Sequence, residues 1–233
     1  MGDYVLLIIV LAVLLFGAVK GYRRGFLRLA VWFAGLIAVL FIVTKISPYV
    51  SDFLIKNTSL YDNVRQRIIV AYEEKNANDI PDDSFSGDER ENRVIDSFGF
   101  PDLITNSIKS NNTSEIYDRL AVTLFKDYIS GYLSALSIKA GTFVGLFVIL
   151  AIIQCVLFLA IKILEKIPVL RTFNRLLGMA TGITLALVLV WVFFIAVMMF
   201  FGRSFGAWVF SQVKASRILT YLFNNNILFE LVK

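Results

Sequence analysis

The chain of 233 residues contains no histidine and a single cysteine, Cys155. Without histidine, it lacks the side chain that most often shuttles protons near neutral pH and most often binds metals. One cysteine permits neither an internal disulfide nor a cysteine metal cluster, and Cys155 stands in an apolar run, where we expect it to be buried as a small hydrophobic residue. The sequence therefore predicts no metal site, no cofactor and no catalytic residues, and we expect a protein that is not an enzyme.

Charge is scarce and unevenly distributed. Only 18% of the residues are charged and 58% are hydrophobic, which gives a mean hydropathy of +0.72. Four long runs contain no charged residue: 4–19, 29–44, 140–161 and 176–202. About 20 apolar residues span a bilayer, and the two shorter runs are flanked by lysines and arginines that can extend to water. We predict an all-α membrane protein with four transmembrane helices in two hairpins.

The charges between these runs predict the orientation. The loop after the first run is basic and lacks acidic residues, and the loop after the third run carries four basic residues against Glu165. Because basic loops stay in the cytoplasm, both termini and the segment 46–138 are expected to be extracytoplasmic. The sequence pI of about 9.3 therefore reflects residues that flank membrane spans, and we expect no nucleic-acid partner.

These features divide the chain into four parts. We expect a first transmembrane hairpin at 1–45, an extracytoplasmic helical insert at 46–138, a second hairpin at 139–202 and an amphipathic interfacial tail at 203–233. The insert holds fifteen acidic and nine basic residues within a chain of net charge +5. Apolar residues spaced four apart predict helices after Ser59 and after Thr113, and the polar stretch 76–89 predicts an exposed acidic loop.

Three glycines recur at four-residue spacing around the first basic loop, at Gly17, Gly21 and Gly25. Their order and the hydrophobic helix before them match neither a P-loop nor a dinucleotide fingerprint, so nucleotide binding is excluded. Glycines on one helical face instead let another backbone approach closely. We expect Gly17 and Gly21 to share a helix and the residues 21–25 to form the turn. Similar pairs are Gly141/Gly145, Gly178/Gly182 and, more weakly, Ala34/Ala38.

The basic residues of the two cytoplasmic loops admit two interpretations. Topology alone explains them, and this is the simpler interpretation. The second interpretation is an anion site, because helices begin near Gly25 and Arg175 and helix N-termini favour the negative head groups of lipids. Its candidate residues are Lys20, Arg23, Arg24, Arg28, Arg171 and Arg175. The expected partners are membrane lipids, and a homo-oligomer or another membrane protein is left open.

Polar residues inside the predicted spans are few. Gln154, Thr142, Thr181 and Thr184 are the main ones, and we expect them to bond to a neighbouring helix or back to their own helix. A coupled transporter usually carries an ionisable residue within its spans. The four runs hold none, which argues against secondary transport by this chain alone.

Three segments carry a resemblance to a known family. Asp3 precedes the first span, "GYRRGF" follows it with Gly21, Arg24 and Gly25, and "NRLLGMATG" opens the last span with Asn174, Arg175, Gly178 and Gly182. In order, spacing and hairpin context these segments resemble the colicin V production (CvpA) family of bacterial membrane proteins. The end, "SRILTYLFNNNIL", is similar to the tails of longer Gram-positive members. Many members continue the second glycine series with Arg-Gly, where this chain has Leu185 and Ala186.

The resemblance implies a protein of the bacterial cytoplasmic membrane. It implies an accessory or structural role in toxin (bacteriocin) production or export and in envelope homeostasis, and it implies no enzymatic activity. The alternative is a subunit of a channel or transporter for small solutes or peptides.

Overall fold

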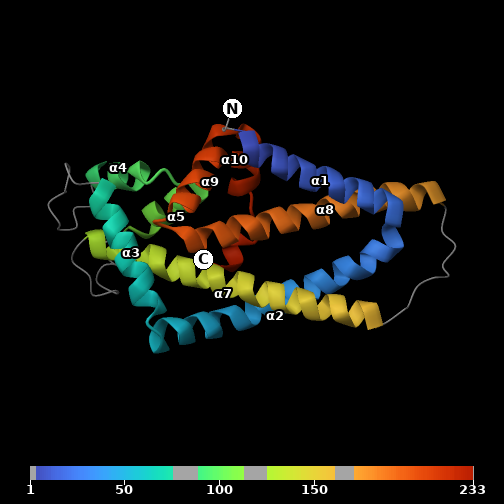
Figure 1. Cartoon of the computed structure of the whole chain (residues 1–233), viewed down its shortest axis with the longest axis horizontal. Helices are drawn as coiled ribbons and strands as arrows, with labels where there is room; N and C mark the ends of the chain where they lie inside the picture. The colour runs from blue at the N-terminus through green and yellow to red at the C-terminus, as the bar shows by residue number, and fades with distance from the viewer. Residues whose placement is uncertain (1–3, 76–88, 113–124, 161–170, 233) are drawn as a thin grey trace.

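Four long apolar helices dominate the chain. The computed structural model describes residues 4–75, 89–112, 125–160 and 171–232 (Figure 1). The long helices are α1 (Val5–Arg24), α2 (Phe26–Asn57), α7 (Phe125–Ala160) and α8 (Arg171–Val197). Each contains a stretch long and apolar enough to cross a membrane, and all regular structure in the described part is helical. The predicted helical fold with four such helices is confirmed.

Two of these helices extend by a dozen residues or more beyond the uncharged runs that predicted them. The expected boundary at 45/46 falls inside α2, which continues to Asn57, and the boundary at 138/139 falls inside α7, which begins at Phe125. A charged residue ends a hydrocarbon span but does not end a helix, so Lys45 and Lys139 lie within helices. Even Pro48 is inside α2, where the Ser51 hydroxyl donates to its carbonyl (3.0 Å).

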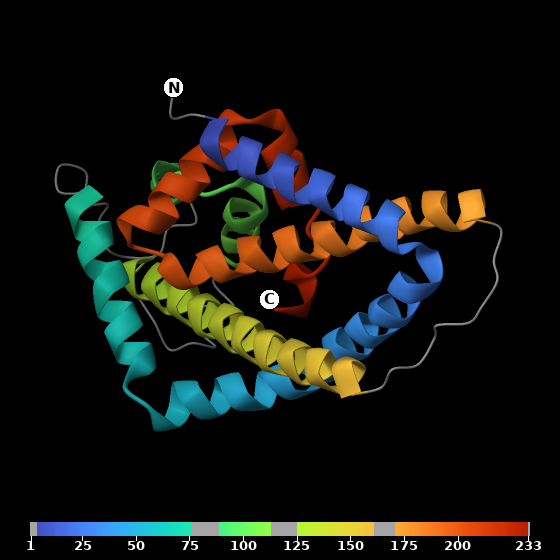
Figure 2. The same ribbon diagram turned by 45° about the vertical axis from the view of Figure 1, so that its right-hand side comes forward.

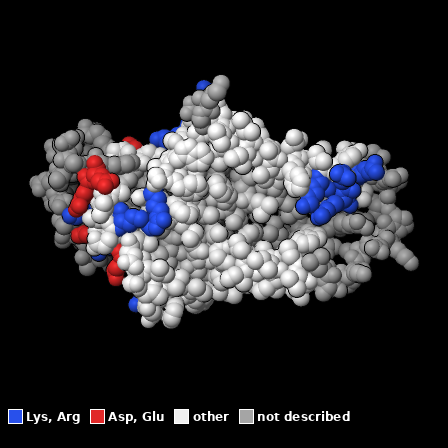
Figure 3. Space-filling model, in the orientation of Figure 1, with Lys and Arg blue, Asp and Glu red and all other residues white. Residues whose placement is uncertain are grey.

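The long helices pack in a defined order. α1 lies along α8, and α2 crosses beside α7 and α8 (Figures 1 and 2). The turn between α1 and α2 and the start of α8 lie at the same end of the molecule. In Figure 3, a cluster of Lys and Arg atoms without acidic neighbours lies at this end, both basic and acidic atoms show at the opposite end, and the broad surface between them is largely uncharged. Such a distribution fits an apolar belt between two polar ends.

The opposite end is formed by shorter helices. They are α3 (Leu60–Lys75), α4 (Glu89–Ser97), α5 (Asp102–Asn111), η2 (Met198–Phe200), α9 (Ser204–Ala215), α10 (Arg217–Asn224) and η3 (Phe229–Leu231). The helix predicted after Ser59 is present as α3. Most of the predicted acidic loop and of the helix predicted after Thr113 lie outside the described residues, although Tyr128 at the end of that helix is part of α7.

Insert and tail share one hydrophobic core at this end. Phe100, which precedes α5, lies 5.0 Å from Phe201 and 5.6 Å from Phe210 of α9 between ring centroids. Phe223 of α10 packs 5.1 Å from Phe194 of α8, and all these rings are buried. The tail is thus two helices that close the core, and the expectation that it lies in a membrane interface stays a prediction.

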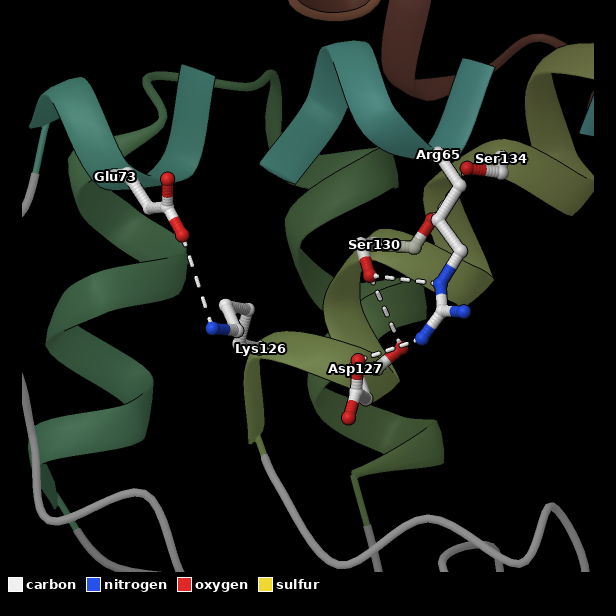
Figure 4. A network of polar contacts seen from close by, with 6 residues as sticks. All are labelled: Arg65, Glu73, Lys126, Asp127, Ser130 and Ser134. Carbon is white, nitrogen blue, oxygen red and sulfur yellow. Dashed lines mark hydrogen bonds and ion pairs between the residues drawn. The ribbon is translucent and has the colours of Figure 1, made fainter. Parts of the chain in front are cut away.

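A polar network attaches α3 to the start of α7 (Figure 4). Arg65 Nη2 lies 2.6 Å from Asp127 Oδ1, and Arg65 Nε donates to the Ser130 hydroxyl (3.4 Å). Lys126 and Glu73 form a longer ion pair of 3.7 Å. Because about a third of each side chain in the Arg65–Asp127 pair is exposed, the network positions α3 more than it stabilises the fold.

The carbonyl groups just beyond the end of α8, in residues 198–201, accept hydrogen bonds from side chains of other helices. Arg67 of α3 donates to the carbonyls of Met199 (3.3 Å) and Phe201 (3.2 Å). The Ser137 hydroxyl of α7 donates to the Met198 carbonyl (3.0 Å). Partial burial, and then the charge of Arg203, lower the pKa of the Arg67 guanidinium. Helices α3 and α7 are therefore tied to the chain just after α8 ends, where three carbonyl groups of residues 198–201 accept side-chain hydrogen bonds.

We predict that Arg67→Ala destabilises the protein by about 1–2 kcal/mol, because it removes two hydrogen bonds made by a charged donor. Unfolding by denaturant in detergent micelles measures the change. Arg203→Ala is the matched control: it deletes a neighbouring exposed arginine and lessens repulsion of Arg67, so it should leave stability unchanged or slightly higher. An equal loss in both variants would contradict the capping role.

Candidate functional site

The chain reverses between α1 and α2 at one residue. α1 continues through Arg24, and α2 begins at Phe26. Gly25 between them has φ +78°, and its amide donates to the Gly21 carbonyl (2.9 Å). The expected turn over residues 21–25 was therefore too long, although Gly17 and Gly21 share a helix as expected. A positive φ is costly for residues with a Cβ, so glycine suits this single-residue turn.

The backbones of α1 and α8 touch along two glycine faces. A Cβ on Gly178 would lie 2.5 Å from the Gly21 oxygen and 2.8 Å from the Gly25 carbonyl carbon. A Cβ on Gly17 would lie 2.6 Å from the Gly182 oxygen. The reciprocal positions, Gly21 against Gly178 and Gly182 against Gly17, are closer still. At these four positions even a Cβ would collide with the opposite backbone, so the two motif segments identified in the sequence pack directly against each other.

The close contact extends one step further at each end. At one end, the Cβ of Ala186 lies 2.6 Å from where a Cβ on Gly17 would be. The small side chain of Ala186 thus continues the face and is buried. At the other end, the amide of Asn174 occupies the space that a Cβ on Gly25 would need. Asn174 therefore covers the turn that joins α1 to α2.

The other small-residue pairs do not mark comparable contacts. A Cβ on Gly141 would meet only the flexible end of Met199 (3.2 Å), and nothing lies within 4 Å of one on Gly145. Ala34 and Ala38 are exposed. Four-residue spacing is shared by all these pairs, so what distinguishes Gly17 and Gly21 is the glycine face that lies opposite them.

This packing brings basic side chains from both motifs to one edge. The Arg175 guanidinium lies over the Tyr22 ring, 5.6 Å from its centroid, and Lys20 Nζ lies 5.1 Å from the Phe16 centroid. Lys20, Arg23 and Arg24 are exposed, and Arg175 is half-buried. We call these four residues the basic edge. The other two candidates are Arg28, in the first turn of α2, and Arg171, the first residue of α8; their side chains, like the whole of Asp3, lie outside the described residues.

The basic edge has the features of an anion-binding surface. Within the described parts of the chain, none of its four residues forms an ion pair with a carboxylate. α2 begins directly after Gly25, and the N-cap position, a glycine, supplies no side-chain cap, so the N-terminal end of this helix lies at the turn that carries Arg23 and Arg24. Helix N-termini and cations both favour negative groups. The edge offers charge and hydrogen-bond donors, but no group that accepts protons near neutral pH.

Four polar residues within the long helices were predicted to bond to a neighbouring helix or to their own helix, and three of them do. Gln154 Nε2 of α7 donates to the Trp32 carbonyl of α2 (3.1 Å). The hydroxyls of Thr181 and Thr184 donate to carbonyls of their own helix (2.9 and 3.1 Å). Thr142 differs, because its hydroxyl oxygen is buried and has no hydrogen-bond partner among the described residues.

The structure bears on the sequence-based expectations for Cys155 and for a metal site. Cys155 is exposed, so the expectation of burial is wrong: on a helix that faces lipid, an apolar run has an outer surface as well as a packed one. Among the described residues, no three or more cysteine, aspartate or glutamate side chains form a group that could hold a metal ion. Three serines that the sequence patterns did not single out, Ser130, Ser134 and Ser137, lie buried along α7. Their four- and three-residue spacing places them on one helical face, and this spacing could have identified them.

Comparison with protein-family models, with curated proteins and with solved structures finds no match. The resemblance to the colicin V production family therefore depends on the motif segments themselves. In the structure, two of these segments, "GYRRGF" and "NRLLGMATG", are in contact.

We predict that Gly21→Ala destabilises the protein by about 1–3 kcal/mol, because its methyl group meets the backbone of Gly178, which cannot yield without separating the helices. Thermal unfolding in detergent measures the change. Gly145→Ala is the matched control, since it adds the same methyl group to a helix where nothing lies within 4 Å. It should be neutral or stabilising by at most about 1 kcal/mol through helix propensity. Equal stability of the two variants would contradict the close contact.

Proposed function

We propose that this chain is a multi-pass protein of the bacterial cytoplasmic membrane, of the colicin V production type, with an accessory and non-enzymatic role. That role is to support toxin (bacteriocin) production or export and envelope homeostasis. The observation that carries the proposal is the direct packing of "GYRRGF" on "NRLLGMATG", because it joins the segments of the resemblance into one site. The glycines of both segments serve one packing contact, and that contact brings basic side chains of both segments together, with the Arg175 guanidinium over the Tyr22 ring.

The proposed topology has two hairpins, α1–α2 and α7–α8, with the basic edge in the cytoplasm. The basic residues on both sides of the close contact support this orientation through the positive-inside rule. Both termini and the segment with α3, α4 and α5 then lie outside the cytoplasm. In this topology the contact between α1 and α8 holds one hairpin to the other.

At the molecular level, the basic edge binds the head groups of anionic lipids. Each lysine or arginine near a membrane surface contributes about 1 kcal/mol to such binding. The N-terminal end of α2 adds its partial positive charge, and stacking on Tyr22 holds the Arg175 guanidinium in place. Cations and amides bind anions without chemical conversion, which supports a binding role over a catalytic one.

We predict that replacing Arg24 and Arg175 by alanine weakens the retention of anionic lipid by roughly 30-fold, as two contributions of about 1 kcal/mol each imply. Native mass spectrometry of protein released from mixed bilayers of phosphatidylglycerol and phosphatidylcholine measures the retained lipids and the stoichiometry together. Membrane insertion should be unchanged.

Two controls accompany this measurement. Arg217→Ala removes an exposed arginine from α10 at the opposite end and should leave lipid retention unaltered. Lysine at positions 24 and 175 keeps the charge, so an equal loss with lysine and alanine indicates a need for guanidinium geometry. No loss in any variant would refute the site, and solute flux through reconstituted protein would favour the channel alternative.

A further inference from the structure

An apolar groove lies between α2 and α8, next to the basic edge. It has a volume of about 370 Å³, and its walls include Phe26, Ala30, Ala34 and Ile37 of α2 and Ala180 and Thr184 of α8. That volume is within the range of small-molecule sites in proteins. The groove arises because small side chains face each other where the two helices diverge.

The walls of the groove offer an occupant almost no polar group. Thr181 and Thr184 have hydroxyls, but both donate to carbonyls of their own helix, which leaves their methyl groups for contact. Ala34, Ile37, Ala180 and Thr184 are exposed, so the groove opens to the surroundings of the bundle. All four lie in the stretches able to span a membrane, so the medium that meets this opening is hydrocarbon.

The length of the groove separates two apolar occupants. From Phe26 to Ile37, α2 rises by about 16 Å at about 1.5 Å per residue. This is roughly half the hydrocarbon thickness of about 30 Å, and therefore about the depth of one leaflet. A transmembrane helix from a second copy would cross both leaflets, whereas a lipid acyl chain ends at the bilayer centre.

Charge separates the same occupants. The groove begins at Phe26, two residues after Arg24 in the chain, so it starts at the same end of the bundle as the basic edge. A second copy would bring its own Lys20, Arg23 and Arg24 to that end, and the like charges would repel. An anionic head group would be attracted, and its acyl chain would lie in the apolar part below.

We propose that the groove and the basic edge together form a binding site for one anionic phospholipid of the adjacent leaflet. One acyl chain lies between α2 and α8, and the phosphate lies against the basic residues. This inference rests on the proposed function, because it takes the basic edge as the head-group site and adds a site for the chain. It distinguishes a defined lipid site from a diffuse electrostatic attraction to the membrane surface.

The test fills the groove without touching the basic edge. Ala34→Leu and Ala180→Leu each add bulk to a wall of the groove, and Ala12→Leu adds the same bulk to an exposed position of α1 outside it. Native mass spectrometry from bilayers of phosphatidylglycerol and phosphatidylcholine measures retained lipid. We expect roughly tenfold weaker retention of phosphatidylglycerol in both groove variants, equal to about 1.4 kcal/mol, and no change in Ala12→Leu.

The other outcomes fail in distinguishable ways. Unchanged retention in the groove variants, together with a loss in the Arg24→Ala and Arg175→Ala variant, overturns the chain site and leaves the head-group site intact. A dimer that only the groove variants lose overturns the proposal in favour of a second copy. Wild-type protein that retains phosphatidylglycerol no better than phosphatidylcholine overturns both proposals.

A second measurement needs no variant. Phosphatidylglycerol with a photoreactive group near the middle of one acyl chain is incorporated with the wild-type protein into vesicles, and the labelled residues are mapped. Labels concentrated on α2 and α8 near Ala34 and Ala180 support the site. Labels spread evenly over the exposed faces of α1 and α7 overturn it.

Discussion

The backbone contact between α1 and α8 is the constraint on which the rest of this structure depends. In lipid, helices gain little by burying apolar side chains against each other, so their association depends on close van der Waals packing. Gly17 and Gly21 against Gly178 and Gly182 supply that packing over two helical turns. A side chain at any of these glycines would meet backbone atoms, which cannot move aside as a side-chain end can. The contact therefore fixes the position of α1 on α8, and with it the place of the turn at Gly25.

The remaining features follow from where this contact places α8. In α8, 44% of the apolar stretch is buried, against 17% in α1 and in α2, so it is the central helix of the four. Its first half carries the glycines and Arg175, which stacks on Tyr22 at the basic edge. Its second half packs on rings from the tail, and Arg67 and Ser137 cap the carbonyls beyond it. One helix thus connects the basic edge to the polar end, and a groove remains where α2 diverges from it.

Sequence patterns predicted the parts of this arrangement that depend on local chemistry. Charge-free runs located four helices that could span a membrane, and apolar periodicity located α3. The same patterns placed helix ends at charges, whereas α2 and α7 continue past Lys45 and Lys139. Spacing could not separate Gly17 and Gly21 from Gly141 and Gly145, because the difference lies in the element opposite each pair. Contacts such as Arg67 with the end of α8 join residues more than 130 positions apart, and no local pattern encodes them.

Gly21 and Gly178 take part in one shared contact, and a double-mutant cycle measures the coupling between them. Alanine at either position pushes the helices apart at the same place, so the second substitution should cost little once the first is present. The measurement is the unfolding free energy of Gly21→Ala, Gly178→Ala and the double variant in detergent. We expect the double variant to lose clearly less unfolding free energy than the sum of the two single losses. Losses that add to within about 0.3–0.5 kcal/mol, as for distant sites, would contradict it.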